Sequence, residues 1–169
     1  MKKIFIAIAA IALSTAAKAQ TTYSAGLEVG LPSGDASTIS GLGIGGSVKA
    51  NFALGKSENS SMTGSIGFIN FTGKDVSILG VTVKYPSMTA IPVKFGYRYT
   101  TESGLFFEPQ AGLTFFNNSA GTGFTWAGNV GYKVSDNLDL SARYESAGLS
   151  GGGTFNHIGF RLAYAFGGK

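Results

Sequence analysis

Eight charged side chains stand at alternate positions of otherwise apolar segments, and they are the residues of this sequence best placed to do chemistry. They are Glu28, Lys49, Lys94, Arg98, Glu108, Arg143, Glu145 and Arg161. Counted from the ends of their segments, most of them fall at a similar height, with acids and bases mixed. Charges that leave bulk water must be paired and hydrogen-bonded, so we expect a network of ion pairs. Neighbouring segments set the expected pairs: Glu28 with Lys49 and Arg161, Lys94 with Glu108, and both Arg143 and Glu145 near Arg161.

His157 is the single histidine of the chain and could act as a general acid or base. A hydrolase would need a nucleophile beside it, yet no G-x-S-x-G or comparable serine motif accompanies it. A metal site needs several ligands, and the chain has no cysteine and no second histidine. We therefore predict no catalytic residue, no metal and no cofactor, and a lipid-modifying enzyme that uses His157 stays as a lesser alternative.

Two glycine clusters resemble phosphate-binding loops in composition. Residues 41–46 read GLGIGG and residues 151–153 read GGG, but neither cluster leads into a helical pattern whose N-terminus could hold a phosphate. We interpret the first cluster as room for neighbouring side chains inside the fold, and the second as an external loop.

Eight segments with period-two alternation must position these residues. Residues 91–100 (IPVKFGYRYT) show the pattern most clearly, with Lys94 and Arg98 on the face opposite the large apolar side chains. The chain has 26 glycines, 13 phenylalanines and 7 tyrosines, and beyond residue 20 no window has helical periodicity. The sequence thus predicts an all-β fold with strands near residues 22–31, 39–54, 62–71, 87–100, 104–116, 122–134, 138–146 and 155–166.

The two faces of these segments differ in charge and in size. No charged residue falls on the apolar face of any segment, whereas the opposite face combines the charges with Gly, Ala, Ser, Thr and Asn. A soluble barrel would have to enclose the apolar face, and so many Phe, Tyr and Leu side chains would overfill an eight-stranded interior. A small, polar interior with bulky apolar residues outside is the pattern of a transmembrane β-barrel.

This alternation is similar to that of the eight-stranded outer-membrane β-barrel proteins of Gram-negative bacteria, the OmpA/OmpX-like group. The resemblance rests on IPVKFGYRY (91–99), LFFEPQAGLTFF (105–116) and HIGFRLAYAF (157–166). It implies an antiparallel up-and-down barrel, contact with outer-membrane lipid, and a C-terminal strand that the barrel-insertion machinery recognises.

Aromatic residues gather near the segment ends, as amphipathic rings do at both surfaces of a membrane. We expect two girdles. The first, toward the periplasm, holds Tyr23, Phe52, Tyr97, Tyr99, Tyr132 and Phe166, and the second, toward the outside, holds Phe68, Phe115, Phe124, Trp126 and Tyr144.

Residues 1–19 read as a secretory signal peptide, with Lys2 and Lys3 before an apolar run and an Ala-Lys-Ala cleavage signature at residues 17–19. We expect export and a barrel domain over residues 20–169. Loss of three lysines with the leader leaves a nearly neutral chain, which gives no support to nucleic-acid binding.

An even strand count places both ends of the barrel domain in the periplasm, so the connections 32–38, 72–86, 117–122 and 147–154 point outward. Residues 72–86 contain further alternation, and we expect a hairpin there. The prediction is a monomeric, non-enzymatic outer-membrane protein with a structural or surface-interaction role, a lumen closed by a salt-bridge network, and external loops 72–86 and 147–154 open to a ligand. The alternatives are a secreted soluble barrel that carries an apolar ligand, a narrow gated pore, and the lipid-modifying enzyme.

Overall fold

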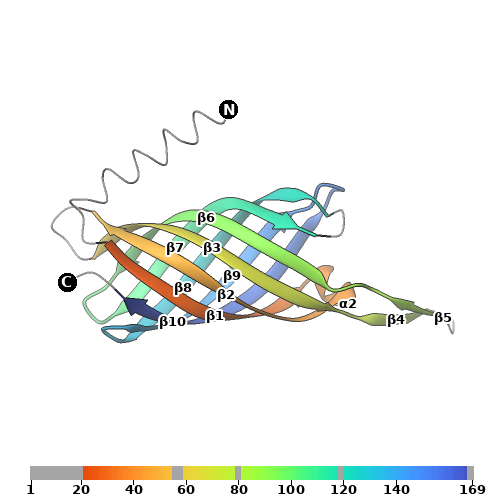
Figure 1. The fold of residues 1–169 in the computed structure, drawn as a ribbon, viewed down its shortest axis with the longest axis horizontal. Coiled ribbons are helices and arrows are strands. Elements are labelled where there is room, and N and C mark those ends of the chain that lie inside the picture. The colour runs from red at the N-terminus through yellow and green to blue at the C-terminus, as the bar shows by residue number, and fades with distance from the viewer. Residues whose placement is uncertain (1–20, 55–58, 79–80, 118–119, 167–169) are drawn as a thin grey trace.

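Eight long antiparallel strands close into a barrel in the computed structural model, which describes residues 21–54, 59–78, 81–117 and 120–166 (Figure 1). The strands are β1 (Thr21–Ser33), β2 (Ser40–Ala53), β3 (Ser60–Gly73), β6 (Met88–Thr100), β7 (Leu105–Phe116), β8 (Thr122–Ser135), β9 (Leu138–Gly148) and β10 (Thr154–Phe166). Their order around the barrel is β1-β10-β9-β8-β7-β6-β3-β2. The pairing of β1 with β10 closes the barrel. The predicted eight-stranded up-and-down barrel is confirmed, whereas the predicted signal peptide lies outside the described residues.

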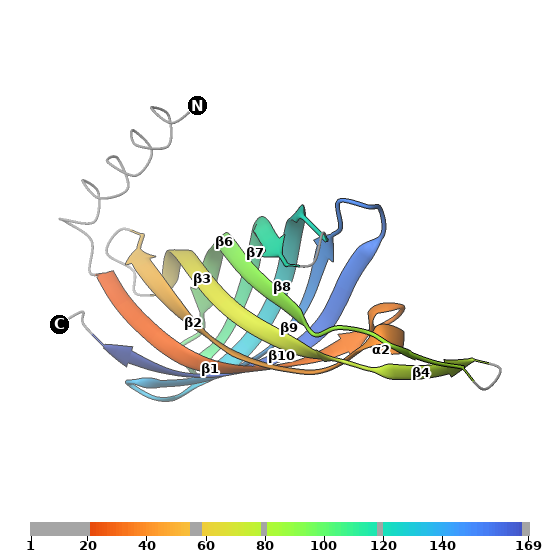
Figure 2. The ribbon, with the colours of Figure 1, turned by 45° about the vertical axis from the view of Figure 1, so that its right-hand side comes forward.

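Three short elements extend one end of the barrel. The helix α2 (Ala36–Ile39) follows β1, and β4 (Asp75–Ile78) and β5 (Val81–Lys84) form a two-stranded hairpin between β3 and β6. Figures 1 and 2 show this hairpin projecting beyond the barrel, at the end opposite the start of β1 and the end of β10. We call these ends the hairpin end and the termini end. No helix in the described part of the chain has the length and apolar character needed to cross a membrane.

The faces of the barrel are inverted relative to a soluble protein. Leu27 is 74% exposed and Phe95 66% exposed on the outside, whereas Lys94 is 2% exposed and Glu108 is fully buried in the lumen. A soluble fold buries such apolar side chains and leaves such charges in water. The predicted apolar exterior and charged interior are therefore both present.

Glycines leave room in the lumen for large side chains of other strands. A methyl group at Gly43 would lie 2.5 Å from ring carbons of Phe71, and one at Gly131 would lie 2.3 Å from Cζ of Phe106. An eight-stranded interior is only just wide enough for side chains to fill it. A bulky residue on one strand therefore requires a residue without a side chain on another.

An apolar cluster fills the lumen toward the hairpin end. Its buried members are Ala36, Ile69, Phe71, Ala90 and Phe155, and Met88, Phe116 and Leu149 pack against them. The rings of Phe71 in β3 and Phe155 in β10 lie 4.8 Å apart, although β2 and β1 separate these strands around the wall. The contact therefore crosses the interior. The sequence analysis predicted a small, polar lumen, which describes most of the interior but not this end.

The exposed apolar face leads to a depth-dependent prediction. Val130 lies near the middle of β8 with its side chain outward, so Val130→Arg should lower the free energy of unfolding in lipid vesicles by roughly 2–4 kcal/mol. Val134 lies on the same face near the end of the same strand, where Val134→Arg should cost only about 0–1 kcal/mol. Urea unfolding measures both, and equal losses would contradict a lipid-facing exterior.

Candidate functional site

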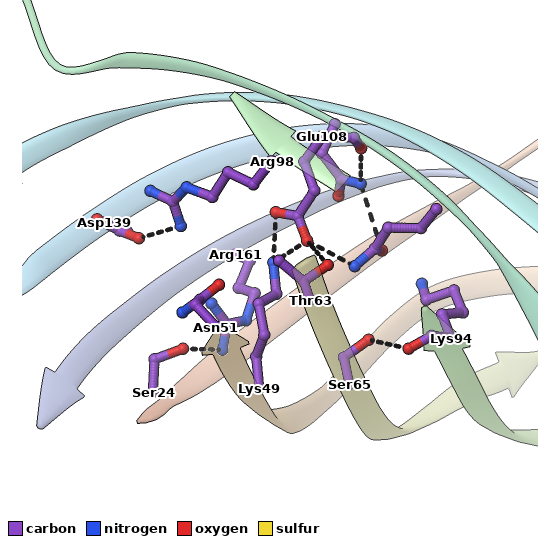
Figure 3. Close-up of polar contacts among 12 residues, drawn as sticks. Ser24, Lys49, Asn51, Thr63, Ser65, Lys94, Arg98, Glu108, Asp139 and Arg161 are labelled. Atoms are coloured by element: carbon purple, nitrogen blue, oxygen red, sulfur yellow. Dashed lines mark hydrogen bonds and ion pairs between the residues drawn. The ribbon is translucent and has the colours of Figure 1, made fainter. Parts of the chain in front are cut away.

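The densest polar contacts of the lumen surround Glu108 of β7 (Figure 3). Lys49 Nζ donates hydrogen bonds of 2.8 and 2.7 Å to the two carboxylate oxygens of Glu108. Thr63 Oγ1 and Gln110 Nε2 also donate to Oε1, at 2.9 and 2.7 Å. Asn129 Nδ2 donates to the backbone carbonyl of the same residue at 2.7 Å. Several donors thus replace the water that this buried carboxylate has lost.

A second set of ion pairs links β1, β6, β9 and β10. Glu145 binds both Lys94 Nζ and Arg143, whose Nε lies 3.1 Å from its Oε2. Arg143 Nη2 is also 2.5 Å from Glu28 Oε2, and Arg161 Nε is 3.7 Å from Glu28 Oε1. Two carboxylates therefore hold three cations in one chain of contacts.

A third pair lies nearer the termini end. Arg98 Nη1 is 2.8 Å from Asp139 Oδ2, and its guanidinium carbon lies 3.6 Å from the centre of the Phe106 ring. A guanidinium over an aromatic face gains a cation–π attraction. Asp139 shares the interior parity of β9, which was the signal for its role, but the sequence analysis did not include it in the network.

Two of the predicted pairs, Glu28 with Lys49 and Lys94 with Glu108, were wrong, although all eight predicted residues lie buried in the lumen. Glu28 does lie near Arg161, but the partner of Lys94 is Glu145 and the partner of Glu108 is Lys49. Two strands separate β6 from β9 and β2 from β7 around the wall. The prediction assumed contacts between adjacent strands, whereas these side chains reach across the interior. On the adjacent strand β7, the residue paired with Lys94 is Gly112, which has no side chain to contact it.

The ion pairs leave little space in this part of the lumen. A cavity of about 10 Å³ remains among Glu28, Lys49, Lys94, Arg143 and Arg161 together with neutral neighbours. That is roughly the volume needed for one water molecule. The ionic layer and the apolar cluster are thus two successive obstructions along the barrel axis.

His157 lies in the lumen and not on the lipid face. Its side chain is 3% exposed, and its ring centre lies 5.3 Å from that of Phe71 and 6.2 Å from that of Phe155. Neither ring nitrogen has a hydrogen-bond partner among the described residues. The same residues contain no group of three His, Cys, Asp or Glu side chains able to hold a metal ion.

The eleven residues predicted as aromatic girdles lie on the outer face of the barrel. Tyr23 stacks on Phe166 at 6.4 Å near the termini end, and Trp126 contacts Tyr144 at 5.6 Å toward the hairpin end. All eleven are exposed except Phe52, which is half-buried. Their placement at the two membrane surfaces stays a prediction.

The Glu108 contacts lead to a prediction about stability. Glu108→Gln should lower the free energy of unfolding by about 3–5 kcal/mol, because it leaves the buried Lys49 ammonium without its carboxylate. Asp75→Asn removes the partner of Lys84 in an exposed pair 3.9 Å apart and should cost less than about 1 kcal/mol. Urea midpoints in lipid vesicles compare the two variants, and a loss no larger for Glu108→Gln would contradict the buried pairing.

Three solved structures show how widely this barrel recurs. The crystal structure of Ail, the attachment invasion locus protein of Yersinia pestis, has a TM-score of 0.60 at 12% identity and covers 88% of this chain and 99% of its own. Ail in complex with the heparin analogue sucrose octasulfate has a TM-score of 0.56 at 14% identity, covering 86% and 97%. The N-terminal β-barrel domain of Pseudomonas aeruginosa OprF has a TM-score of 0.53 at 18% identity, covering 88% and 100%. At these identities the likeness is one of fold.

The family assignment comes from the sequence. No curated protein sequence matches the chain. The family model described as the outer membrane protein beta-barrel domain matches residues 4–166, which is nearly the whole chain. Together with the closed eight-stranded barrel and its apolar exterior, this match shows that the chain belongs to the outer membrane protein β-barrel domain family.

Proposed function

We propose that this chain is an integral outer-membrane protein without enzymatic activity that serves a structural or surface-interaction role. One observation carries the proposal: side chains cross and fill the lumen, so the hairpin end is the part of the barrel left for an external partner. The proposal includes export by the signal peptide, a monomeric state and insertion through the C-terminal strand, β10.

The filled lumen argues against the gated pore. An eight-stranded barrel leaves no aqueous channel once side chains occupy its interior. For ions to pass, the ion pairs of Glu108, Glu145 and Glu28 would have to separate. The ring contact between Phe71 and Phe155 would have to open as well. Removing one partner of a buried pair costs several kcal/mol, so such openings are rare events.

The same interior argues against the other two alternatives. A carrier of apolar ligands would need an apolar cavity inside the barrel, but the space near the ionic layer amounts to about 10 Å³ and is lined by charges. A lipid-modifying enzyme would need its histidine where lipid can reach it, and His157 is buried in the lumen against Phe71.

The β4–β5 hairpin is the best candidate for the interaction surface. In the described residues its strands pair with each other as a two-stranded sheet, separate from the barrel sheet. Exposed strand edges can accept a strand of another protein. Val83 and Tyr85 add partly exposed apolar side chains. The second candidate is the connection 147–154.

The charge of the hairpin end favours a protein partner over a polyanion. The four outward connections contain Asp35, Lys74, Asp75 and Lys84, two acids and two bases. Lys74 donates to the carbonyl of Ser37, and Lys84 lies near Asp75. These connections therefore carry no basic cluster that would match the heparin analogue bound by Ail.

Conductance in planar lipid bilayers tests the closed lumen. The folded protein should give no current steps above the lipid baseline, because the ionic layer and the apolar cluster both obstruct the axis. Heat-modifiable migration in gels shows that the inserted protein is folded. Regular current steps from folded protein would overturn the structural role and support the gated pore.

Cysteine labelling on intact cells tests the orientation. Ser77→Cys in the hairpin and Ser150→Cys near the same end should react with a membrane-impermeant maleimide, because both residues are exposed. Ser103→Cys, exposed in the connection between β6 and β7 at the termini end, should stay unlabelled until the outer membrane is permeabilised. The reverse pattern would place the hairpin in the periplasm and end the proposed surface role.

A further inference from the structure

The small cavity of the ionic layer has an unusual lining. Four cations line it, Lys49, Lys94, Arg143 and Arg161, but Glu28 is the one carboxylate among its lining residues. Glu108 and Glu145 bind three of these cations, Lys49, Lys94 and Arg143, from outside the lining. The neutral lining includes Gln110 and Asn129, whose side-chain amides donate to Glu108. The cavity is thus lined by more cations than carboxylates.

The ion pairs do not balance the charge of the lumen. The described network holds five cations, which are Lys49, Lys94, Arg98, Arg143 and Arg161. Its carboxylates are Glu28, Glu108, Glu145 and Asp139, the last with a 13% exposed side chain. Five positive charges against four negative ones leave a net charge of +1. An uncompensated charge enclosed in a barrel is costly unless a counter-charge accompanies it.

Two buried guanidinium nitrogens lack hydrogen-bond acceptors among the described residues. They are Arg143 Nε and Arg98 Nη2. Arg143 lines the cavity and is 8% exposed, and its Nε lies 3.1 Å from Glu145 Oε2 without the alignment of a hydrogen bond. Buried donors in native proteins nearly always have a partner. The charge excess and the cavity therefore lie among the same side chains, one of which has a donor nitrogen without an aligned acceptor.

We propose that this cavity binds one small monovalent anion, with chloride as the physiological candidate. A volume of about 10 Å³ has room for at most one particle near the size of a water molecule. Water fits by size, but an anion also neutralises the excess charge and gains from the four cations around it. The anion is a structural counter-ion that stabilises the closed lumen, a role separate from any partner at the hairpin.

Anion-dependent stability tests the proposal. The chain is folded into lipid vesicles and unfolded with urea in sodium chloride or in sodium gluconate at equal ionic strength, since gluconate is too large for the cavity. The wild-type midpoint should lie at a higher urea concentration in chloride. Equal midpoints in the two salts would overturn the proposal, and the cavity would then hold water.

A built-in carboxylate provides the sharpest variant. Ser65 of β3 lines the cavity, so Ser65→Asp supplies the negative charge covalently and should abolish the difference between the two salts. Ser77→Asp makes the same change in the exposed hairpin and should keep the full difference, which controls for general salt effects. A difference that persists in folded Ser65→Asp would overturn the site.

A second variant and a direct measurement still test the proposal if Ser65→Asp does not fold. Arg161→Gln removes one lining cation while Glu28 keeps its 2.5 Å contact with Arg143, and it too should abolish the salt difference. Crystals grown in sodium bromide should show an anomalous peak between Arg143 and Arg161. A lumen without that peak would overturn the proposal whatever the variants do.

Discussion

A charged group inside this barrel has lost bulk water, so it must find its counter-charge on another side chain of the same interior. That constraint organises the structure. Glu108 holds Lys49 and two neutral donors, and Glu145 holds Lys94 beside Arg143. The contacts of Glu108 with Lys49 and of Glu145 with Lys94 join strands that are not neighbours in the wall. Closure of the backbone forms the barrel, and these cross-links make its interior a packed layer.

The narrow interior makes glycine as important as charge. Large side chains fit in the lumen because their register partners on the neighbouring strand lack a side chain, as Gly131 does beside Phe106 and Gly43 does beside Phe71. The same device serves the ionic layer and the apolar cluster. The abundance of glycine in this chain therefore reflects the packing of side chains in the lumen more than the flexibility of loops.

The exterior and the interior of the barrel have different contacts. The wall presents Leu27 and Phe95 to lipid, and the lumen closes on itself, so neither surface is free for a soluble partner. The hairpin of β4 and β5 belongs to neither surface and projects from the barrel as a separate small sheet. The proposed role, a structural barrel with one interactive end, rests on this division.

The sequence by itself determined the strands, the inversion of their faces and the burial of the eight network charges, because period-two alternation depends on neighbours along one strand. It did not determine which charge meets which. Lys94 and Glu108 lie on adjacent strands, yet each pairs across the interior, and Ile69 and Phe71 join Phe155 from the other side of the barrel. Those contacts depend on the curvature of the closed wall and on the space left by glycines of other strands, which only the tertiary structure decided.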